Sequence, residues 1–403
     1  MIEMMIGSAE PQDYGEIERL IQRAFKNSSL ECTMVEVATR EDPNFRPGDL
    51  RIVKIGQKIV SMMLIMRRQL RIGSAVVEGA LVGPVATLPE FERQGYCSAV
   101  MRDGVRHMRE QGLDLTILWG HPWLYPRYRY SPAMMSTELV LRPTTMEGAV
   151  AREKCEFRPF GKEDLTRVTG IYHENTGGVT CAEIRSPLLW EWSSHGSAKL
   201  EVLEDSSGVV VGYLVLGTDW GHPAALEIGA LNNVACAAIF SRLMEMGWKE
   251  VPCLVHPCHP FARFAFWQGG EVRIRSGGGA GMARVLNISS LLSKLVGVLG
   301  SRLAHSELHG DSFRLRVSCE EGTAVIRAKD GEVAVDTDNE ECELGLRLPV
   351  AYLNPLVTGY KGIHELATDP QARLKGGERT LRLAEILFPE GFPRGGHIPL
   401  VWE

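Results

Sequence analysis

Apolar positions between Val76 and Gly112 follow first the period of a strand and then that of a helix. The strand runs to Thr87, is broken by Pro89, and gives way at Gly95 to a helix. The helix has apolar residues at one spacing, i, i+3, i+4, i+7, i+8 and i+11: Cys97, Val100, Met101, Gly104, Val105 and Met108. Such a strand–loop–helix directs free backbone N–H groups and a helix dipole at one spot. It predicts a pyrophosphate site, with an ordinary strand-to-helix turn as the alternative.

The segment before this helix predicts a strand, a helix and a hairpin. Residues 2–10 form the first strand, and Asp13 can cap a helix. The apolar side of that helix consists of Tyr14, Ile17, Leu20, Ile21 and Phe25. Residues 26–49 are polar with little periodicity, so we expect a long loop with some helix that faces the substrate. Residues 50–55 and 58–66 flank Gly56 and Gln57 as a hairpin.

A weak repeat covers residues 152–287. F-A-R-F-A-F at 261–266 resembles Y-P-R-Y-R-Y at 125–130, and L-E-V-L-E-D-S-S-G-V-V-V-G-Y-L-V at 200–215 resembles the hairpin at 50–65. Two differences separate the copies: Phe261 stands at the position of Tyr125, and residues 228–236 lack the R-Q-G sequence of the first copy. The second copy is therefore predicted to share the fold but not the chemistry.

The last third of the chain has a different pattern of apolar residues. Leucines at helical spacing predict an amphipathic helix over 288–303, and alternating apolar residues predict strands within 313–335. Glu321-Gly322 and Asp330-Gly331 mark hairpin turns between them, and helices are predicted near 349–367 and 379–388. The pattern is that of an α+β domain with a filled core.

Composition excludes several classes of protein. No apolar run reaches the ~18 residues of a membrane helix, and the N-terminus lacks the features of a signal peptide. Nine irregularly spaced cysteines indicate reduced thiols and a cytoplasmic location. The net charge of −6, without a basic block, argues against nucleic acid and mildly favours cationic ligands.

Three motifs together resemble one enzyme family. They are V-x-x-x-P-x-x-x-R-Q-G-Y at 85–96, L-x-x-L-x-G at 115–120 and Y-x-R-Y-x-Y-x-P-A at 125–133. They look like the GNAT family of acetyl-CoA-dependent N-acetyltransferases, and the last motif is similar to the "enhanced intracellular survival" branch. The sequence departs from the family loop at Glu92 and Cys97.

The resemblance implies a mixed α/β (α+β) fold with three domains. An active GNAT domain would occupy residues 1–150, a degenerate GNAT domain 151–287, and a sterol-carrier-like domain 288–403. L-x-x-L-V-T-G-Y at 353–360 is the segment that resembles the third domain. A filled α+β core without lipid is the preferred interpretation of that last part.

The same resemblance assigns the coenzyme-binding residues. Main-chain groups of Val85, Ala86 and Thr87 would bind the pantetheine arm and polarise the carbonyl. The pyrophosphate of acetyl-CoA would be held by the loop residues Arg93, Gln94, Gly95, Tyr96, Cys97 and Ser98. Cys97 lies on the predicted core face of its helix, which favours direct transfer over a covalent Cys97 intermediate.

Two residues are assigned to proton transfer. Tyr125 lies where the family has its general acid, and a tyrosine with an ordinary pKa near 10 keeps its proton at neutral pH; a merely packed aromatic is the alternative. In this branch the C-terminal carboxylate reaches the site, so Glu403 is the candidate base, with a frayed terminus as the alternative. If Glu403 is not the base, Glu78 or a water-mediated route is the alternative.

A metal site is not expected. Cys253, His256, Cys258 and His259 are clustered, but they do not form the two separated pairs that are typical of zinc sites. His121, beside Pro122, is interpreted as a turn residue rather than a base.

The sequence therefore predicts an acetyl-CoA-dependent N-acetyltransferase without a metal cofactor. Its acceptor would be a small-molecule primary amine, such as an aminoglycoside or a polyamine. We expect no nucleic-acid partner and no membrane association, and a homo-oligomer is compatible with the sequence. The alternative is a non-catalytic acyl-CoA or lipid sensor on a GNAT scaffold, which the departures at Glu92 and Cys97 would support.

Overall fold

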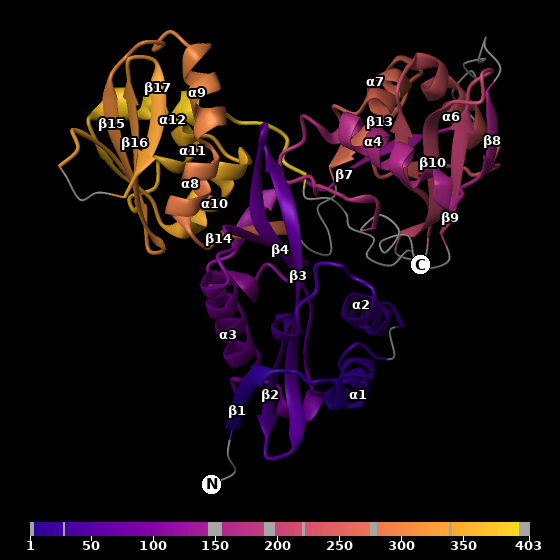
Figure 1. Cartoon of the computed structure of the whole chain (residues 1–403), viewed down its shortest axis with the longest axis horizontal. Coiled ribbons are helices and arrows are strands. Elements are labelled where there is room, and N and C mark those ends of the chain that lie inside the picture. Colours follow the sequence, from indigo (N-terminus) through magenta and orange to yellow (C-terminus); the bar gives the residue numbers. More distant parts are fainter. Residues whose placement is uncertain are drawn as a thin grey trace. The chain divides into compact units, whose positions relative to one another are not determined.

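The chain folds into two compact units (Figure 1). The computed structural model describes residues 4–26, 29–143, 155–188, 198–219, 222–274, 280–337 and 341–394. The first unit comprises Met1–Met135, Thr180–Glu183 and Gly277–Gly395, and the second comprises Ser136–Val179, Ile184–Ser276 and Gly396–Glu403. The described sheets of both units are mixed and flanked by helices, which confirms the predicted fold class.

The first sheet has the strand order β1-β2-β3-β4-β5-β14-β6. Its strands are β1 (Met4–Ser8), β2 (Leu50–Ile55), β3 (Lys58–Ile72), β4 (Ala75–Thr87), β5 (Leu115–Gly120), β6 (Ser131–Met134) and β14 (Ala280–Val285). All neighbours are antiparallel except β4 and β5, which run parallel. A parallel pair needs a crossover connection, and the predicted helix after Gly95 supplies it.

Helices cover both faces of this sheet (Figure 1). The crossover helix α3 (Tyr96–Glu110) buries Val100, Met101 and Met108 against alternate residues of the strands, among them Met63 and Ile65. Helices α1 (Tyr14–Ala24) and α2 (Ser29–Arg40) lie on the other face. Helix α2 occupies part of the segment predicted as mostly loop, because Leu30, Met34 and Ala38 lie at i, i+4 and i+8 among polar residues. Short turns of 3₁₀ helix, η1 (Pro11–Asp13), η2 (Pro47–Asp49) and η3 (Pro89–Phe91), connect these elements.

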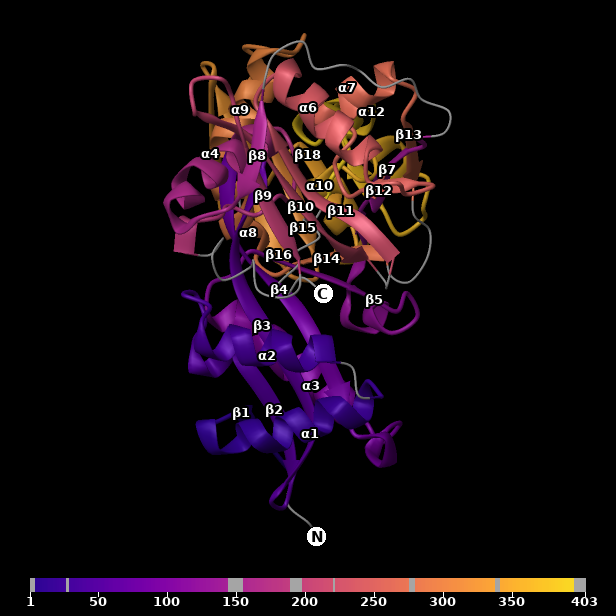
Figure 2. The same ribbon diagram turned by 90° about the vertical axis from the view of Figure 1, so that its right-hand side faces the viewer.

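The second unit repeats this layout, as the sequence predicted. Its sheet has the order β8-β9-β10-β11-β12-β7-β13, and β11 and β12 are its parallel pair. The strands are β7 (Thr137–Leu141), β8 (Glu156–Pro159), β9 (Lys199–Glu204), β10 (Val210–Asp219), β11 (His222–Ala230), β12 (Val251–Cys253) and β13 (Glu271–Ile274). The turn η5 (Lys162–Asp164) leads into α4 (Leu165–Thr176), which packs on one face, and α6 (Asn233–Met244) and α7 (Pro260–Trp267) pack on the other (Figure 2).

The two sheets exchange one strand. β7 follows the first sheet in sequence but lies between β12 and β13 in the second, while β14 follows the second sheet in sequence and lies between β5 and β6 in the first. β7 therefore supplies a strand of the second sheet, and β14 supplies a strand of the first. The domain limits 1–150, 151–287 and 288–403 stay a prediction, and the exchange occurs at the first two junctions.

The first unit also contains a third sheet, with the order β17-β16-β15-β18-β19. Its elements are β15 (Phe313–Cys319), β16 (Gly322–Lys329), β17 (Glu332–Asp336), β18 (Leu344–Arg347), β19 (Arg373–Lys375), α8 (Ile288–Lys294), α9 (Val296–Ala304), α10 (Val350–Thr358), α11 (Ile363–Leu366) and α12 (Gly377–Leu387). Buried leucines such as Leu315, Leu299 and Leu383 fill its core. Within the described ranges, no helix combines the length and apolar character needed to cross a membrane.

Candidate active site

The parallel strands β4 and β5 separate before either one ends. Their register runs from Gly79 with Leu115 to Leu81 with Ile117, and no further ladder joins them in the described part of the chain. β4 nevertheless continues to Thr87, with a bulge in which Gly83 and Pro84 face Leu64 of β3. Backbone groups on the β5 side of this extension are therefore left for another partner, as the predicted role of Val85–Thr87 in binding a pantetheine arm requires.

Helix α3 begins with uncapped N–H groups. Gly95 is its N-cap residue, with φ +91°, and no side chain caps the helix. The first intrahelical bond runs from the N–H of Ala99 to the carbonyl of Gly95, so the amides of Tyr96, Cys97 and Ser98 precede the ladder. The first turn contains no acidic residue, and a Cβ placed on Gly95 would meet open space. This helix end has the open space and the free N–H donors that a phosphate group needs.

The loop before α3 is open to solvent. Glu92, Arg93 and Gln94 are all exposed. Arg93 adopts a left-handed backbone (φ +59°), and the Gln94 amide donates to the carbonyl of Glu90 at 2.9 Å. The departure at Glu92 therefore places a carboxylate at the outer edge of the loop.

Tyr125 follows β5, which ends at Gly120, and begins the turn η4 (Tyr125–Tyr128). Its ring lies so close to Gly120 that a Cβ there would be 2.2 Å from Cε2 of Tyr125. The residue is only 9 % exposed, yet its hydroxyl has no hydrogen-bond partner among the described residues. Burial raises the pKa of Tyr125 above its ordinary value, and Cys97, Tyr130 and Tyr128 add to the rise. The hydroxyl therefore keeps its proton and is available to a ligand.

Tyr128 joins this turn to the first turn of α3. Its hydroxyl lies 2.8 Å from the Ser98 hydroxyl in the first turn of α3. Burial also raises the pKa of the neighbouring Cys97 thiol, and hydrogen bonds with Tyr128 and Thr87 only partly offset that rise. Cys97 is thus held as a thiol, which disfavours it as a nucleophile. The sequence alone indicates only a packed aromatic at Tyr128, because 30 residues separate it from Ser98.

The structure thus brings together Thr87, Cys97, Ser98 and Tyr125 from segments that are distant in sequence. It does not bring Glu78 there. Glu78 adjoins the Gly79–Leu115 pair, whereas Tyr125 follows Gly120 at the other end of β5, ~16 Å away along the strand. Glu403 lies outside the described residues, so its role stays a prediction.

The second copy lacks an open helix start. Its counterpart of α3 is α6, whose N-cap residue Asn232 accepts a hydrogen bond from the N–H of Ala235 at 2.8 Å. The position of Tyr125 is taken by Phe261, which is fully buried and has no hydroxyl. A side chain of the protein therefore occupies a helix end that is open in the first copy, which gives the predicted degeneracy a physical basis.

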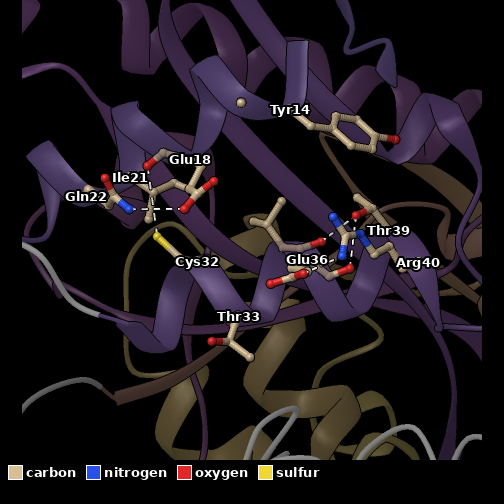
Figure 3. Close-up of a pocket in the computed structure, with 11 residues that line it drawn as sticks. Tyr14, Glu18, Ile21, Gln22, Cys32, Thr33, Glu36, Thr39 and Arg40 are labelled. Atoms are coloured by element: carbon tan, nitrogen blue, oxygen red, sulfur yellow. Dashed lines mark hydrogen bonds and ion pairs between the residues drawn. The ribbon is translucent and has the colours of Figure 1, made fainter. Parts of the chain in front are cut away.

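A pocket of about 770 Å³ lies between α1 and α2 (Figure 3). Figure 3 shows Cys32 of α2 directed toward Glu18 of α1, and Arg40 beside Glu36. Burial and the carboxylates of Glu18, Glu31 and Glu36 raise the pKa of the Cys32 thiol. Glu18 and Glu36 thus contribute carboxylates to this pocket, and Arg40 pairs with one of them, Glu36.

The His and Cys cluster in the second unit has a structural role. His259 caps α7 by accepting from the N–H of Phe261 at 3.1 Å, and His256 accepts from the N–H of Cys258 at 3.1 Å. In the ranges that the structure describes, no group of three His, Cys, Asp or Glu residues is placed to hold a metal ion. His121 stacks on Trp123, with ring centroids 5.2 Å apart, in the exposed turn after β5.

Comparison with known proteins points to one family. Residues 6–133 match the family described as acetyltransferase (GNAT) domain. Over 125 residues the chain is 26% identical to the Uncharacterized N-acetyltransferase YjhQ of Escherichia coli (strain K12), covering 30% of this chain and 67% of that protein.

Two solved structures show the fold of the whole chain. The GCN5-related N-acetyltransferase from Kribbella flavida superposes with a TM-score of 0.76 at 16% identity and covers 97% of both chains. Eis1 from Mycobacterium abscessus superposes with a TM-score of 0.67 at 13% identity, covering 97% of this chain and 98% of that one. At such identities the likeness concerns the fold. Residues 6–133 thus match a GNAT acetyltransferase domain, within a chain that has the fold of these two structures over nearly its whole length.

Proposed function

We propose that the protein transfers the acetyl group of acetyl-CoA to a primary amine by direct attack in a ternary complex. The observation that carries the proposal is the uncapped start of α3 beside the unpartnered hydroxyl of Tyr125. The family match of residues 6–133 supports acetyl transfer, and the N-acetyltransferase name of the Escherichia coli relative supports an amine acceptor.

In the proposed reaction, the amine nitrogen attacks the thioester carbonyl while both reactants are bound. A C–N bond forms and the C–S bond breaks. Amides of the β4 extension stabilise the tetrahedral oxyanion. Tyr125 donates its proton to the departing thiolate. Cys97 takes no part in the reaction, because its thiol is not ionised.

The ammonium form of the amine must lose a proton before it attacks. We propose that the side chain of Glu403 supplies the base. The remote part of the acceptor would be a cation, such as an aminoglycoside or a polyamine. The carboxylates of Glu18 and Glu36, which line the pocket between α1 and α2, support this charge preference.

Release of free thiol from acetyl-CoA, measured with a panel of amines, tests the proposal. Cationic polyamines and aminoglycosides should release thiol faster than neutral amines of similar size, and the preference should weaken with added salt. Tight acetyl-CoA binding without thiol release from any amine would contradict catalysis and favour an acyl-CoA sensor.

A further inference from the structure

A second pocket on the first unit is lined mostly by arginines. It has a volume of about 490 Å³ and lies along α3, η4 and β14. Six of its ten lining residues are arginines: Arg102, Arg106, Arg109, Arg127, Arg129 and Arg284. A pocket of this composition attracts anions strongly.

The carboxylates nearby do not neutralise these arginines. Glu321, which is fully buried, pairs with three of them: Arg109, Arg129 at 3.0 Å and Arg284 at 2.7 Å. Arg106 pairs with Asp103 and Glu110. In the parts of the chain that the structure describes, the side chains of Arg102 and Arg127 have no partner, although both line the pocket. The cluster therefore keeps a net positive charge.

Arg284 places a buried guanidinium at the wall of the pocket. It is 7 % exposed and lines the pocket. One of its terminal nitrogens donates to the carbonyl of Tyr128 at 2.6 Å, and the other pairs with Glu321. Because Glu321 shares its single negative charge among three arginines, Arg284 leaves the pocket positively charged.

The pocket adjoins the coenzyme loop. Tyr128 lines it and is hydrogen-bonded to Ser98 at 2.8 Å. Arg102 follows Ser98 by four residues on α3, so the two side chains share one helix face ~6 Å apart along the axis. A phosphate one ribose away from a pyrophosphate at the start of α3 can reach Arg102.

We propose that this pocket is a binding site for a phosphate-ester dianion, with Arg102 and Arg127 as its principal contacts. Two sources share this chemistry. One is the 3′-phosphate of acetyl-CoA, an alternative that rests on the proposed function. The other is a separate polyphosphate that binds whether or not acetyl transfer occurs.

Binding measurements separate the two sources without relying on activity. In the first arm, titration calorimetry compares acetyl-CoA with acetyl-3′-dephospho-CoA. The wild type should prefer acetyl-CoA about tenfold or more, as expected for hydrogen bonds to a charged group. The double variant Arg102→Gln/Arg127→Gln should lose that preference, while Arg19→Gln, an exposed arginine on α1, should keep it.

In the second arm, tripolyphosphate is added to protein that is saturated with acetyl-CoA. A rise in the Tm of the wild type that is absent in the double variant would identify a separate anion. A positive result in either arm supports the site and identifies which phosphate it binds. The proposal is overturned if the wild type shows no 3′-phosphate preference and no Tm rise, or if the double variant retains whichever effect is seen. Both arms read binding, so an absence of acetyl transfer would contradict the proposed function alone.

Discussion

The hydroxyl groups of Ser98 and Tyr128 lie 2.8 Å apart. Ser98 belongs to the first turn of α3, and Tyr128 ends the turn that begins with Tyr125. One hydrogen bond therefore fixes the start of α3, where we propose that the pyrophosphate binds, relative to the proposed acid. The same tyrosine lines the arginine pocket, so a single ring connects the three parts of the site.

Tyr125→Phe should lower kcat by ~10²–10⁴-fold, the usual contribution of a general acid, because it removes the proton and keeps the ring. Affinity for acetyl-CoA, measured by calorimetry, should change little. Tyr130→Phe is the matched control, since Tyr130 is fully buried and its ring meets that of Tyr125 edge-to-face, with centroids 6.2 Å apart. Near-normal kcat in Tyr125→Phe would remove this residue from the mechanism.

Gly95→Ala should abolish most of the rise in Tm that acetyl-CoA produces. The new methyl group would enter the open space at the start of α3, and the left-handed backbone would be strained by ~1–3 kcal/mol. Gly112→Ala is the control at the other end of the helix, because Gly112 also has a left-handed backbone (φ +74°) and open space. Both variants should lose stability, but only Gly95→Ala should lose the response to acetyl-CoA. An equal response in both would place the coenzyme elsewhere.

Cys97→Ser should retain a kcat within about tenfold of the wild type, because a covalent intermediate at this residue is not part of the proposed reaction. The raised pKa gives a second measurement. Alkylation of Cys97 by iodoacetamide at pH 7 should be slower than that of an ordinary thiol and should accelerate only above the ordinary thiol pKa. Ping-pong kinetics together with an inactive Cys97→Ser variant would contradict direct transfer.

Glu403→Gln should cut kcat sharply without lowering Tm, because it removes the carboxylate that we propose as the base. The measurement is the rate of thiol release from acetyl-CoA at saturating amine. If the variant is as fast as the wild type, the base lies elsewhere.

Glu321→Gln should destabilise the first unit by ~3 kcal/mol, the lower end of the range for breaking a buried ion pair, because Arg109 and Arg129 remain partly exposed. The measurement is the urea concentration at the midpoint of unfolding of the first unit. Glu332→Gln, an exposed carboxylate on β17, is the control and should leave the midpoint nearly unchanged. Equal midpoints for the two variants would show that the three guanidiniums do not depend on Glu321.

Local patterns alone predicted much of this protein. The helix after Gly95 was confirmed, because its apolar spacing and its glycines specify a buried face and two ends without reference to the rest of the chain. The hairpin at 50–66 and the repeat were confirmed for the same reason, since alternation and turn residues act over a few positions. The match of residues 6–133 agrees with the family that the loop and tyrosine motifs indicated.

The tertiary structure decided what depends on contacts between distant segments. The exchange of β7 and β14 pairs each strand with partners that are distant in sequence, and no local pattern encodes such a pairing. The unpartnered hydroxyl of Tyr125, the bond between Ser98 and Tyr128, and the arginines around Glu321 arise only when strands, turns and the third sheet meet. Hydrogen bonds and charge pairing act through space, so the sequence named several members of the site while the fold determined which groups remain available to a ligand.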